Sequence, residues 1–327
     1  MDFKTLGGKM RTITTIFLFI VLFSGVSGQT PTDTVLFNNF SCVYNKKDGK
    51  LDGTYSSYYK DGQIRATGLF KDNFRTGTWS VYDSIGKLVI KREYSAPYTF
   101  KQIFPILPEN ELTRLLNVQW SPQKNEKGYI EYFNIQERMV VFSRVYKSYI
   151  SSRNNPLLFN NDILFRLISS GIKTKKLTAY DVKTDEFEDT LSNEVDPNLY
   201  RHIAFKTKEV CFFDSERMLM DSRIIGICPV AINKISGDTT DLYWIYYPYL
   251  RPFLAEEKVK SNGIPAYISN LDDLLFYRQY SGIIFYVRNW QNPTPELKIE
   301  NATEDFSKQA IIELIETEHD IWRDYSK

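Results

Sequence analysis

The residues best suited to catalysis or metal binding are few and scattered in this sequence. Only two histidines occur, His202 and His319, and neither belongs to a metal-binding spacing such as HxxxH or HExxH. The chain also lacks a GxSxG elbow, a Walker loop, a GxGxxG segment and a cysteine in a nucleophile signature. His319 falls late in a predicted helix, where a basic side chain suits the negative end of the dipole. We therefore predict no catalytic, cofactor-binding or metal-binding residue, and no cofactor.

Two acidic segments could hold a cation or pair two carboxylates. The segment "SGDTTD" (residues 236–241) offers oxygen ligands for Ca²⁺ but lacks the EF-hand spacing, so we interpret it as a polar hairpin turn. The segment "TDEFEDT" (residues 184–190) has the composition of a solvated loop. A glycosidase-like pair of carboxylates distant in sequence stays open, although no motif supports it.

The cysteines leave two interpretations. Cys42, Cys211 and Cys228 are an odd number with no CxxC spacing, which does not describe a disulfide framework. A bridge between Cys211 and Cys228, which flank a predicted turn, is one alternative in an oxidising compartment. The other is that each cysteine is a small buried apolar residue.

The first residues predict export. Residues 1–28 combine a basic start, a short apolar run at residues 16–23 and small residues at a cleavage site, which is the pattern of a secretory signal peptide. The apolar run is too short to span a bilayer, and no cysteine follows the cleavage site to carry a lipid. We therefore predict a periplasmic protein with no direct transmembrane span.

Composition and charge further restrict the fold class and the possible function of the protein. The chain has 327 residues, of which 43% are hydrophobic and 15% aromatic, favouring sheets and interfaces over a helical bundle. Without residues 1–28, its net charge of +1 becomes −1, and no basic stripe occurs elsewhere. Nucleic-acid binding is therefore excluded.

Residues 48–94 contain a repeat. "GTYSSYYKDGQI" begins at Gly53 and "GTWSVYDSIGKL" begins at Gly77, and each copy is typical of two strands joined by a glycine turn. The pattern resembles MORN-like β-repeats. We predict a small, separable antiparallel module at residues 35–98, serving as a spacer or docking module; a platform for a small ligand or lipid is the alternative.

The rest of the chain, residues 105–327, is predicted to be a mixed α/β-sheet domain, which makes the fold class α+β. A helix is expected from Asn134, with Met139, Phe142, Tyr146 and Tyr149 on one stripe. A second helix, "NNDILFRLISSG", is expected to stop at Gly171. A closing amphipathic helix follows from residue 301, with its inward residues at Phe306, Ala310, Ile311 and Leu314.

Consecutive strands are expected in the middle of this domain, at "KEVCFFD", "DSRIIGICPVAI" and "DLYWIYYPYL". These segments, followed by "LDDLLFYRQYSGIIFYV" and "HDIWRDY", resemble in order and wording the GldN/PorN family of the Bacteroidota gliding and type IX secretion machinery. The segment "RLISSGIKTKKLTAYDVKTDEFEDTLSNEV" resembles the middle region of that family. The resemblance covers about residues 130–325.

The resemblance implies a non-enzymatic structural component. It implies an exported protein, peripherally associated with the outer membrane, that binds a GldK/PorK-like lipoprotein and a GldM/PorM-like motor protein and assembles into a ring or larger multimer. The alternative is an exported small-ligand-binding protein or hydrolase built on the same domain. The sequence leaves open whether the chain is the main subunit or an accessory relative.

We predict a partner interface around "DLYWIYYPYLRP". Strand alternation would place Trp244 and Tyr246 on one sheet face and Tyr247 on the other. Arg251 could make bidentate contacts to a carboxylate of a partner, and Arg223 lies on the preceding predicted strand. The alternative is that helices cover both faces within the chain.

Overall fold

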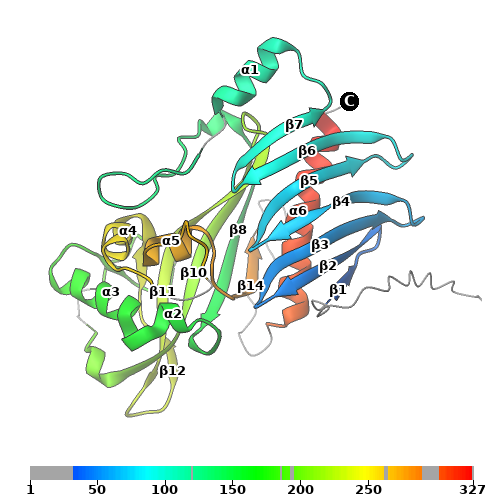
Figure 1. Ribbon diagram of the computed structural model, residues 1–327. Coiled ribbons are helices and arrows are strands. Elements are labelled where there is room, and N and C mark those ends of the chain that lie inside the picture. The colour runs from blue at the N-terminus through cyan, green and yellow to red at the C-terminus, as the bar shows by residue number, and fades with distance from the viewer. Residues whose placement is uncertain are drawn as a thin grey trace, which may run out of the picture.

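Two antiparallel sheets and a long C-terminal helix dominate the computed structural model (Figure 1), which describes residues 32–118, 121–184, 186–191, 195–260, 264–288 and 302–325. The N-terminal sheet precedes a second sheet that carries most of the helices. This confirms the predicted α+β class. The predicted signal peptide, residues 1–28, lies outside the described residues.

The N-terminal sheet is a meander in which every strand pairs with the next one along the chain. Its strands are β1 (Thr32–Leu36), β2 (Phe40–Lys47), β3 (Lys50–Tyr59), β4 (Ile64–Lys71), β5 (Phe74–Tyr82), β6 (Leu88–Ala96) and β7 (Thr99–Phe104). Gly49 and Gly86 have positive φ in the turns β2–β3 and β5–β6, where the repeat predicted glycine turns. The sheet extends beyond the predicted residues 35–98 at both ends.

The second sheet pairs strands that lie far apart in the sequence. Its order is β14 (Ile283–Arg288), β8 (Val140–Ser151), β10 (Tyr200–Asp214), β11 (Leu219–Asn233), β13 (Trp244–Tyr246) and β9 (Ala179–Tyr180), with β12 (Thr239–Asp241) also on β11. The long hairpin β10–β11 forms its centre, and β8 lies between β10 and β14. The polar segment at residues 236–241 contains the end of the β11–β12 turn, as expected.

The helix expected from Asn134 is wrong, because most of that segment is strand β8. A short 3-10 turn, η1 (Glu137–Met139), precedes it. Tyr146, Ser148 and Ile150 are buried with a period of two, which is the periodicity of a strand. The predicted stripe has helical spacing, but pairing with β10 and β14 makes the segment a strand.

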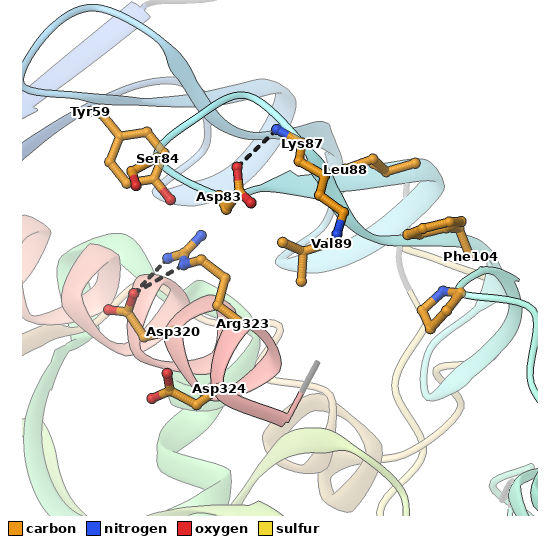
Figure 2. A pocket seen from close by; sticks show the side chains of 11 residues that line it. Tyr59, Asp83, Ser84, Lys87, Leu88, Val89, Phe104, Asp320, Arg323 and Asp324 are labelled. Atoms are coloured by element: carbon orange, nitrogen blue, oxygen red, sulfur yellow. Dashed lines mark hydrogen bonds and ion pairs between the residues drawn. The ribbon is translucent and has the colours of Figure 1, made fainter. Parts of the chain in front are cut away.

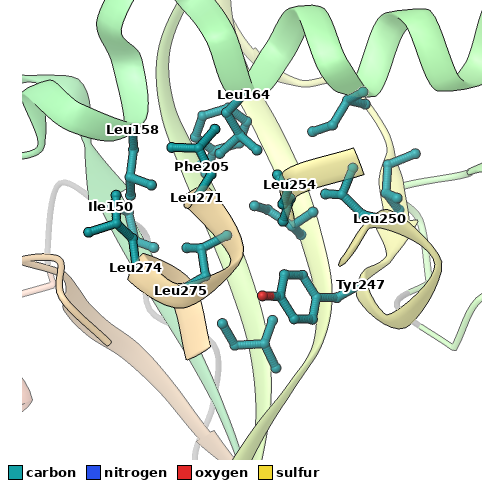
Figure 3. Packing of buried hydrophobic residues seen from close by; sticks show 14 of the residues in the cluster. Ile150, Leu158, Leu164, Phe205, Tyr247, Leu250, Leu254, Leu271, Leu274 and Leu275 are labelled. Atoms are coloured by element: carbon teal, nitrogen blue, oxygen red, sulfur yellow. The ribbon is translucent and has the colours of Figure 1, made fainter. Parts of the chain in front are cut away.

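Short helices cover one side of the second sheet (Figure 1). They are α2 (Pro156–Phe159), α3 (Ile163–Lys173), α4 (Tyr247–Glu256) and α5 (Leu271–Phe276), with 3-10 turns η2 (Ser152–Asn154), η3 (Asn160–Asp162) and η4 (Pro197–Leu199). Their apolar side chains build the main core with β8 and β10; Figure 3 shows Ile150 and Phe205 from the strands facing Leu164, Leu254 and Leu274 from the helices.

Two expected boundaries in this region differ from the structure. The predicted third strand is shorter than expected, because β13 ends at Tyr246 and α4 begins at Tyr247. Pro248 lies in the first turn of α4, where its missing N–H costs no helical hydrogen bond. Gly171 does not stop α3 but lies within it, where Leu177 packs so closely that a Cβ would lie 2.4 Å from Leu177 Cδ1.

The long helix α6 (Glu304–Tyr325) lies against the N-terminal sheet and also contacts β14 of the second sheet (Figure 1). Ala310, with Phe306 and Leu314, packs on Tyr146 and its neighbours in the second sheet. Ile311 packs instead with the apolar cluster of the N-terminal sheet. The predicted closing helix is therefore confirmed, and it divides its inward residues between two sheets. Helix α1 (Glu109–Val118) follows β7.

All three cysteines are buried and free, so the bridge considered between Cys211 and Cys228 does not form. The Cys211 thiol donates a hydrogen bond to Ser222 Oγ at 3.0 Å. Burial raises the pKa of Cys211 to about 12, so this thiol is protonated at neutral pH. The second interpretation of the cysteines, as small buried residues, is therefore confirmed.

Candidate functional site

The five predicted interface residues lie at different depths. Trp244, Tyr247 and Arg251 are buried, with exposed fractions of 4%, 0% and 2%. Tyr246 and Arg223 are half-buried. The structure brings Tyr247 and Arg251 together on the first turns of α4, while Trp244 and Tyr246 lie on β13.

Arg251 binds a carboxylate bidentately, but the carboxylate belongs to the same chain. Its Nε and Nη2 donate to the two oxygens of Asp272 at 2.9 and 2.8 Å, and Nη2 also reaches the carbonyl of Ile130 at 2.6 Å. Tyr247 donates its hydroxyl to the same Asp272 at 3.0 Å. Burial by itself lowers the pKa of Arg251, but Asp272 and Tyr247 hold it above its ordinary value.

Local sequence explains how α5 presents Asp272. Asn270 and Asp273 form a capping box at the start of α5, so the helix begins where the sequence supplies its own cap. The guanidinium of Arg251 also lies over the rings of Tyr129 and Tyr132, at 4.8 and 4.6 Å. These contacts fix Arg251 inside the domain; the assignment of this residue to an interface stays a prediction.

Arg223 and Tyr246 reach the surface in part. Arg223 donates Nη2 to the carbonyl of Phe133, and burial lowers its pKa. Tyr246 makes an edge contact with Tyr249 at 5.2 Å between ring centroids. Because Tyr249 is 62% exposed, these two tyrosines form an aromatic surface at the junction of β13 and α4. We call Tyr246 and Tyr249 the tyrosine patch.

A buried polar cluster joins α6 to the N-terminal sheet, and the sequence analysis missed it. Glu316 accepts from Tyr55 at 2.7 Å and from Arg65 Nε at 2.5 Å, and it lies 3.0 Å from His319 Nδ1. Burial alone would raise the pKa of Glu316, but His319, Arg65 and Tyr55 hold it well below its ordinary value. The spacing of Glu316 and His319, three apart on one helix, was the available signal.

Two residues further along α6, Glu318 forms a second acid–arginine pair. It pairs with Arg75 Nη1 at 2.5 Å and accepts from the backbone N–H of Met220 at 2.7 Å. Arg75 Nη2 lies 3.2 Å from His319 Nε2. His319, which the sequence placed late in the closing helix, is therefore a fully buried connector between two acid–arginine pairs. Burial lowers its pKa, and Glu316 opposes this effect.

A groove of about 690 Å³ lies beside the C-terminal end of α6 (Figure 2). The β5–β6 turn forms one wall, where Asp83 accepts the backbone N–H of Lys87 at 2.8 Å. On the other wall, Arg323 Nη2 donates to Asp320 at 2.6 Å. These polar side chains line both walls of the groove.

Within the described residues, no group of three or more histidine, cysteine or acidic side chains is placed to hold a metal ion. Among the helices in the same part of the chain, none has both the length and the apolar character needed to cross a membrane.

Comparison with known proteins matches residues 193–323 to the family described as "Gliding motility associated protein GldN". The match begins just before η4 and ends within α6, so it covers β10, β11, β12, β13, α4, α5 and β14. No curated protein matches the chain. By its description, the matched family is associated with gliding motility. The chain thus contains a domain of the GldN family, at residues 193–323.

Proposed function

We propose that this chain is a non-enzymatic structural component of a periplasmic, outer-membrane-associated complex for gliding and type IX secretion. It acts by binding a GldK/PorK-like lipoprotein and a GldM/PorM-like motor protein. The match of residues 193–323 to the GldN family carries this proposal. The predicted signal peptide at residues 1–28 supports the periplasmic location.

The tyrosine patch combines Tyr246 of the predicted interface with its exposed neighbour Tyr249. Tyr249 is largely exposed and Tyr246 half-buried, whereas Trp244, Tyr247 and Arg251 are buried. Aromatic side chains that combine apolar area with a hydroxyl are enriched in interface centres. We therefore place the lipoprotein contact on the tyrosine patch, with the buried residues holding it rigid.

Purification of the tagged chain from the cell envelope tests this proposal. The native chain is expected to bring down a lipoprotein and a motor protein of the same machinery. The variant Tyr246→Ala/Tyr249→Ala should lower recovery of the lipoprotein roughly tenfold to a hundredfold. Tyr325→Ala, a substitution of another tyrosine, 53% exposed, should not change recovery.

The possible results test the structural role, the tyrosine patch and the predicted export separately. Recovery of neither partner with the native chain would contradict the structural role itself. Normal recovery with the double variant would remove the tyrosine patch from the interface while leaving that role intact. Mass spectrometry of the purified chain should show an N-terminus near Gln29, and an intact segment 16–23 would contradict the predicted export.

A further inference from the structure

A cavity of about 310 Å³ lies between the two sheets and α6, apart from the groove described above. Ile311, Leu314, Ile315 and Glu318 of α6 line it. Their spacing of three and four residues places them on one face of the helix. The other walls come from strands of both sheets, so the cavity exists only where the N-terminal sheet meets the second one.

The cavity lies where two apolar clusters approach one another without merging. Ile311 and Ile315 pack with the cluster of the N-terminal sheet, while Leu314 packs with that of the second sheet. Protein interiors contain few voids larger than a water molecule, and a large empty cavity lowers stability. A space of this volume at a domain junction therefore has the size and place of a binding site.

The walls favour an aliphatic chain. Leu51 and Phe70 line the cavity from the N-terminal sheet, and Leu219 and Ile284 line it from the second sheet. Cys211 adds a protonated thiol, since burial raises its pKa to about 12. These surfaces are apolar or uncharged, so they would stabilise a hydrocarbon chain by removing it from water.

The charged groups in the cavity wall are already paired. Arg75 pairs with Glu318 at 2.5 Å and Arg278 pairs with Glu209 at 3.1 Å. Asp221, the remaining carboxylate of the wall, is bound by Arg217 at 2.8 Å. A charged ligand would lose its hydration here without gaining an unpaired counter-charge. An uncharged ligand is therefore favoured.

Three side-chain atoms of the wall, Arg75 Nε and the hydroxyls of Tyr94 and Tyr146, are buried without a hydrogen-bond partner among the described residues. Arg75 uses Nη1 and Nη2 for Glu318 and His319, while its Nε is buried and has no hydrogen-bond partner among the described residues. Buried donors are almost always satisfied, because leaving one unpaired costs about 1–3 kcal/mol. A hydroxyl or ester oxygen on a ligand would satisfy it.

We propose that this cavity binds an uncharged single-chain amphiphile, an aliphatic chain with a hydroxyl or ester head group. The chain lies along Ile311, Leu314 and Ile315, and the head group accepts from Arg75. This inference does not depend on the partners proposed above, because it rests on the cavity alone.

Fluorescence of N-phenyl-1-naphthylamine, an uncharged apolar dye, tests the proposal with the purified full chain. The dye should bind saturably, and monolauroylglycerol below its micelle concentration should displace it. Laurate at pH 8, which has a similar chain and a charged head, should displace it roughly tenfold less well. Failure of saturable dye binding, or of displacement by monolauroylglycerol, would overturn the proposal. Equal displacement by laurate would contradict the proposal that the ligand is uncharged.

Variants locate the binding to the cavity. Leu314→Trp and Ile315→Trp should each weaken dye and monolauroylglycerol binding roughly tenfold or more. Gln309→Trp, at an exposed position of the same helix, should bind as the native chain does. If either α6 variant fails to fold, Cys211→Met fills the cavity from the sheet side and should give the same loss. If a folded variant with a filled cavity bound the dye and monolauroylglycerol as tightly as the native chain, the ligand would not bind in this cavity.

Arg75→Lys tests the head-group contact. Lysine keeps a positive charge for Glu318 but has no Nε–H. The variant should bind monolauroylglycerol more weakly while binding the dye as the native chain does. Unchanged affinity for monolauroylglycerol would overturn the contact with Arg75.

Discussion

The two sheets differ in how far apart along the sequence their partners lie. Every strand of the N-terminal sheet pairs with the strand next to it in the chain. In the second sheet, β8 pairs with β10 and β14, and the chain forms helices α2 and α3 before it returns to β10. Because its strands pair with their neighbours in the chain, the first sheet can be predicted from the sequence. The pairing of the second sheet depends on contacts between distant segments, which no short segment predicts.

The two regions also bury their arginines differently. In the second region, Arg251 and Asp272 come from α4 and α5, so the pair is internal to that region. In the first, Arg65 and Arg75 lie on the N-terminal sheet, while their partners Glu316 and Glu318 lie on α6 at the other end of the chain. The meander forms locally, but its buried charges are neutralised by the GldN-family domain.

Of the changes considered, deleting residues 30–98 should have the largest effect on the stability of the chain. The repeat predicts a separable module, and hence a remainder that folds cooperatively. The structure leads us to expect the opposite, because Ile312 and Trp322 of α6 and the acid Glu316 would lose the strands that cover them. Near-UV circular dichroism and urea unfolding measure this. A remainder with a native spectrum and one sharp transition would show that the second region stands alone.

Arg251→Ala should destabilise the chain by about 3–5 kcal/mol, because removing one partner leaves the other buried charge uncompensated. Among the described residues, Asp272 would keep Tyr247 as its hydrogen-bond donor. Arg65→Ala should cost less, since Glu316 keeps Tyr55 and His319. Chemical denaturation compares the two variants. If Arg251→Ala lost lipoprotein binding at an unchanged melting temperature, Arg251 would serve the interface, as first predicted, rather than the fold.

Two glycines that pack against aromatic rings, one in each sheet, offer a matched pair of substitutions with smaller expected effects on stability. A Cβ at Gly68 would lie 2.1 Å from the Trp79 ring, so Gly68→Ala should destabilise the N-terminal sheet by about 1–3 kcal/mol. At Gly226 a Cβ would lie 2.6 Å from Phe187 Cζ, the far end of a side chain that can move. Gly226→Ala should therefore cost less in a thermal melt. The reverse order would show that the second sheet is the more rigid one.

The smallest expected effect is a change in the pH dependence of stability at His202, which lies on β10 of the second sheet. Burial lowers the pKa of His202 to about 4, and its ring stacks on Phe165. Because the unfolded pKa is about 6.5, this residue contributes stability above pH 6.5 that is lost as the pH falls toward 4. His202→Phe should reduce the loss of stability between pH 7.5 and pH 5 in urea unfolding. An unchanged pH dependence would assign that loss to other groups.

The sequence predicted the elements whose structure depends on residues close together in the chain. The glycine and aromatic repeat predicted the meander, and the period of apolar residues predicted α6 and the β10–β11 hairpin. The prediction failed at β8, where the predicted stripe of Met139, Phe142, Tyr146 and Tyr149 has helical spacing but the segment pairs with β10 and β14 as a strand. It also placed Tyr247 on a strand that had already ended. In both cases the local pattern is ambiguous, and a distant partner decides.

The sequence by itself determined the α+β class, the order of strands in the meander and the resemblance to the GldN family. These depend on turn residues, on apolar periodicity and on motifs read in order. Only the tertiary structure decided the depth of Arg251, the pairing of Glu316 with Arg65 and the cavity between the sheets. Ion pairs join residues up to 275 positions apart in the sequence, and a cavity is a property of packing, so no single segment determines either one.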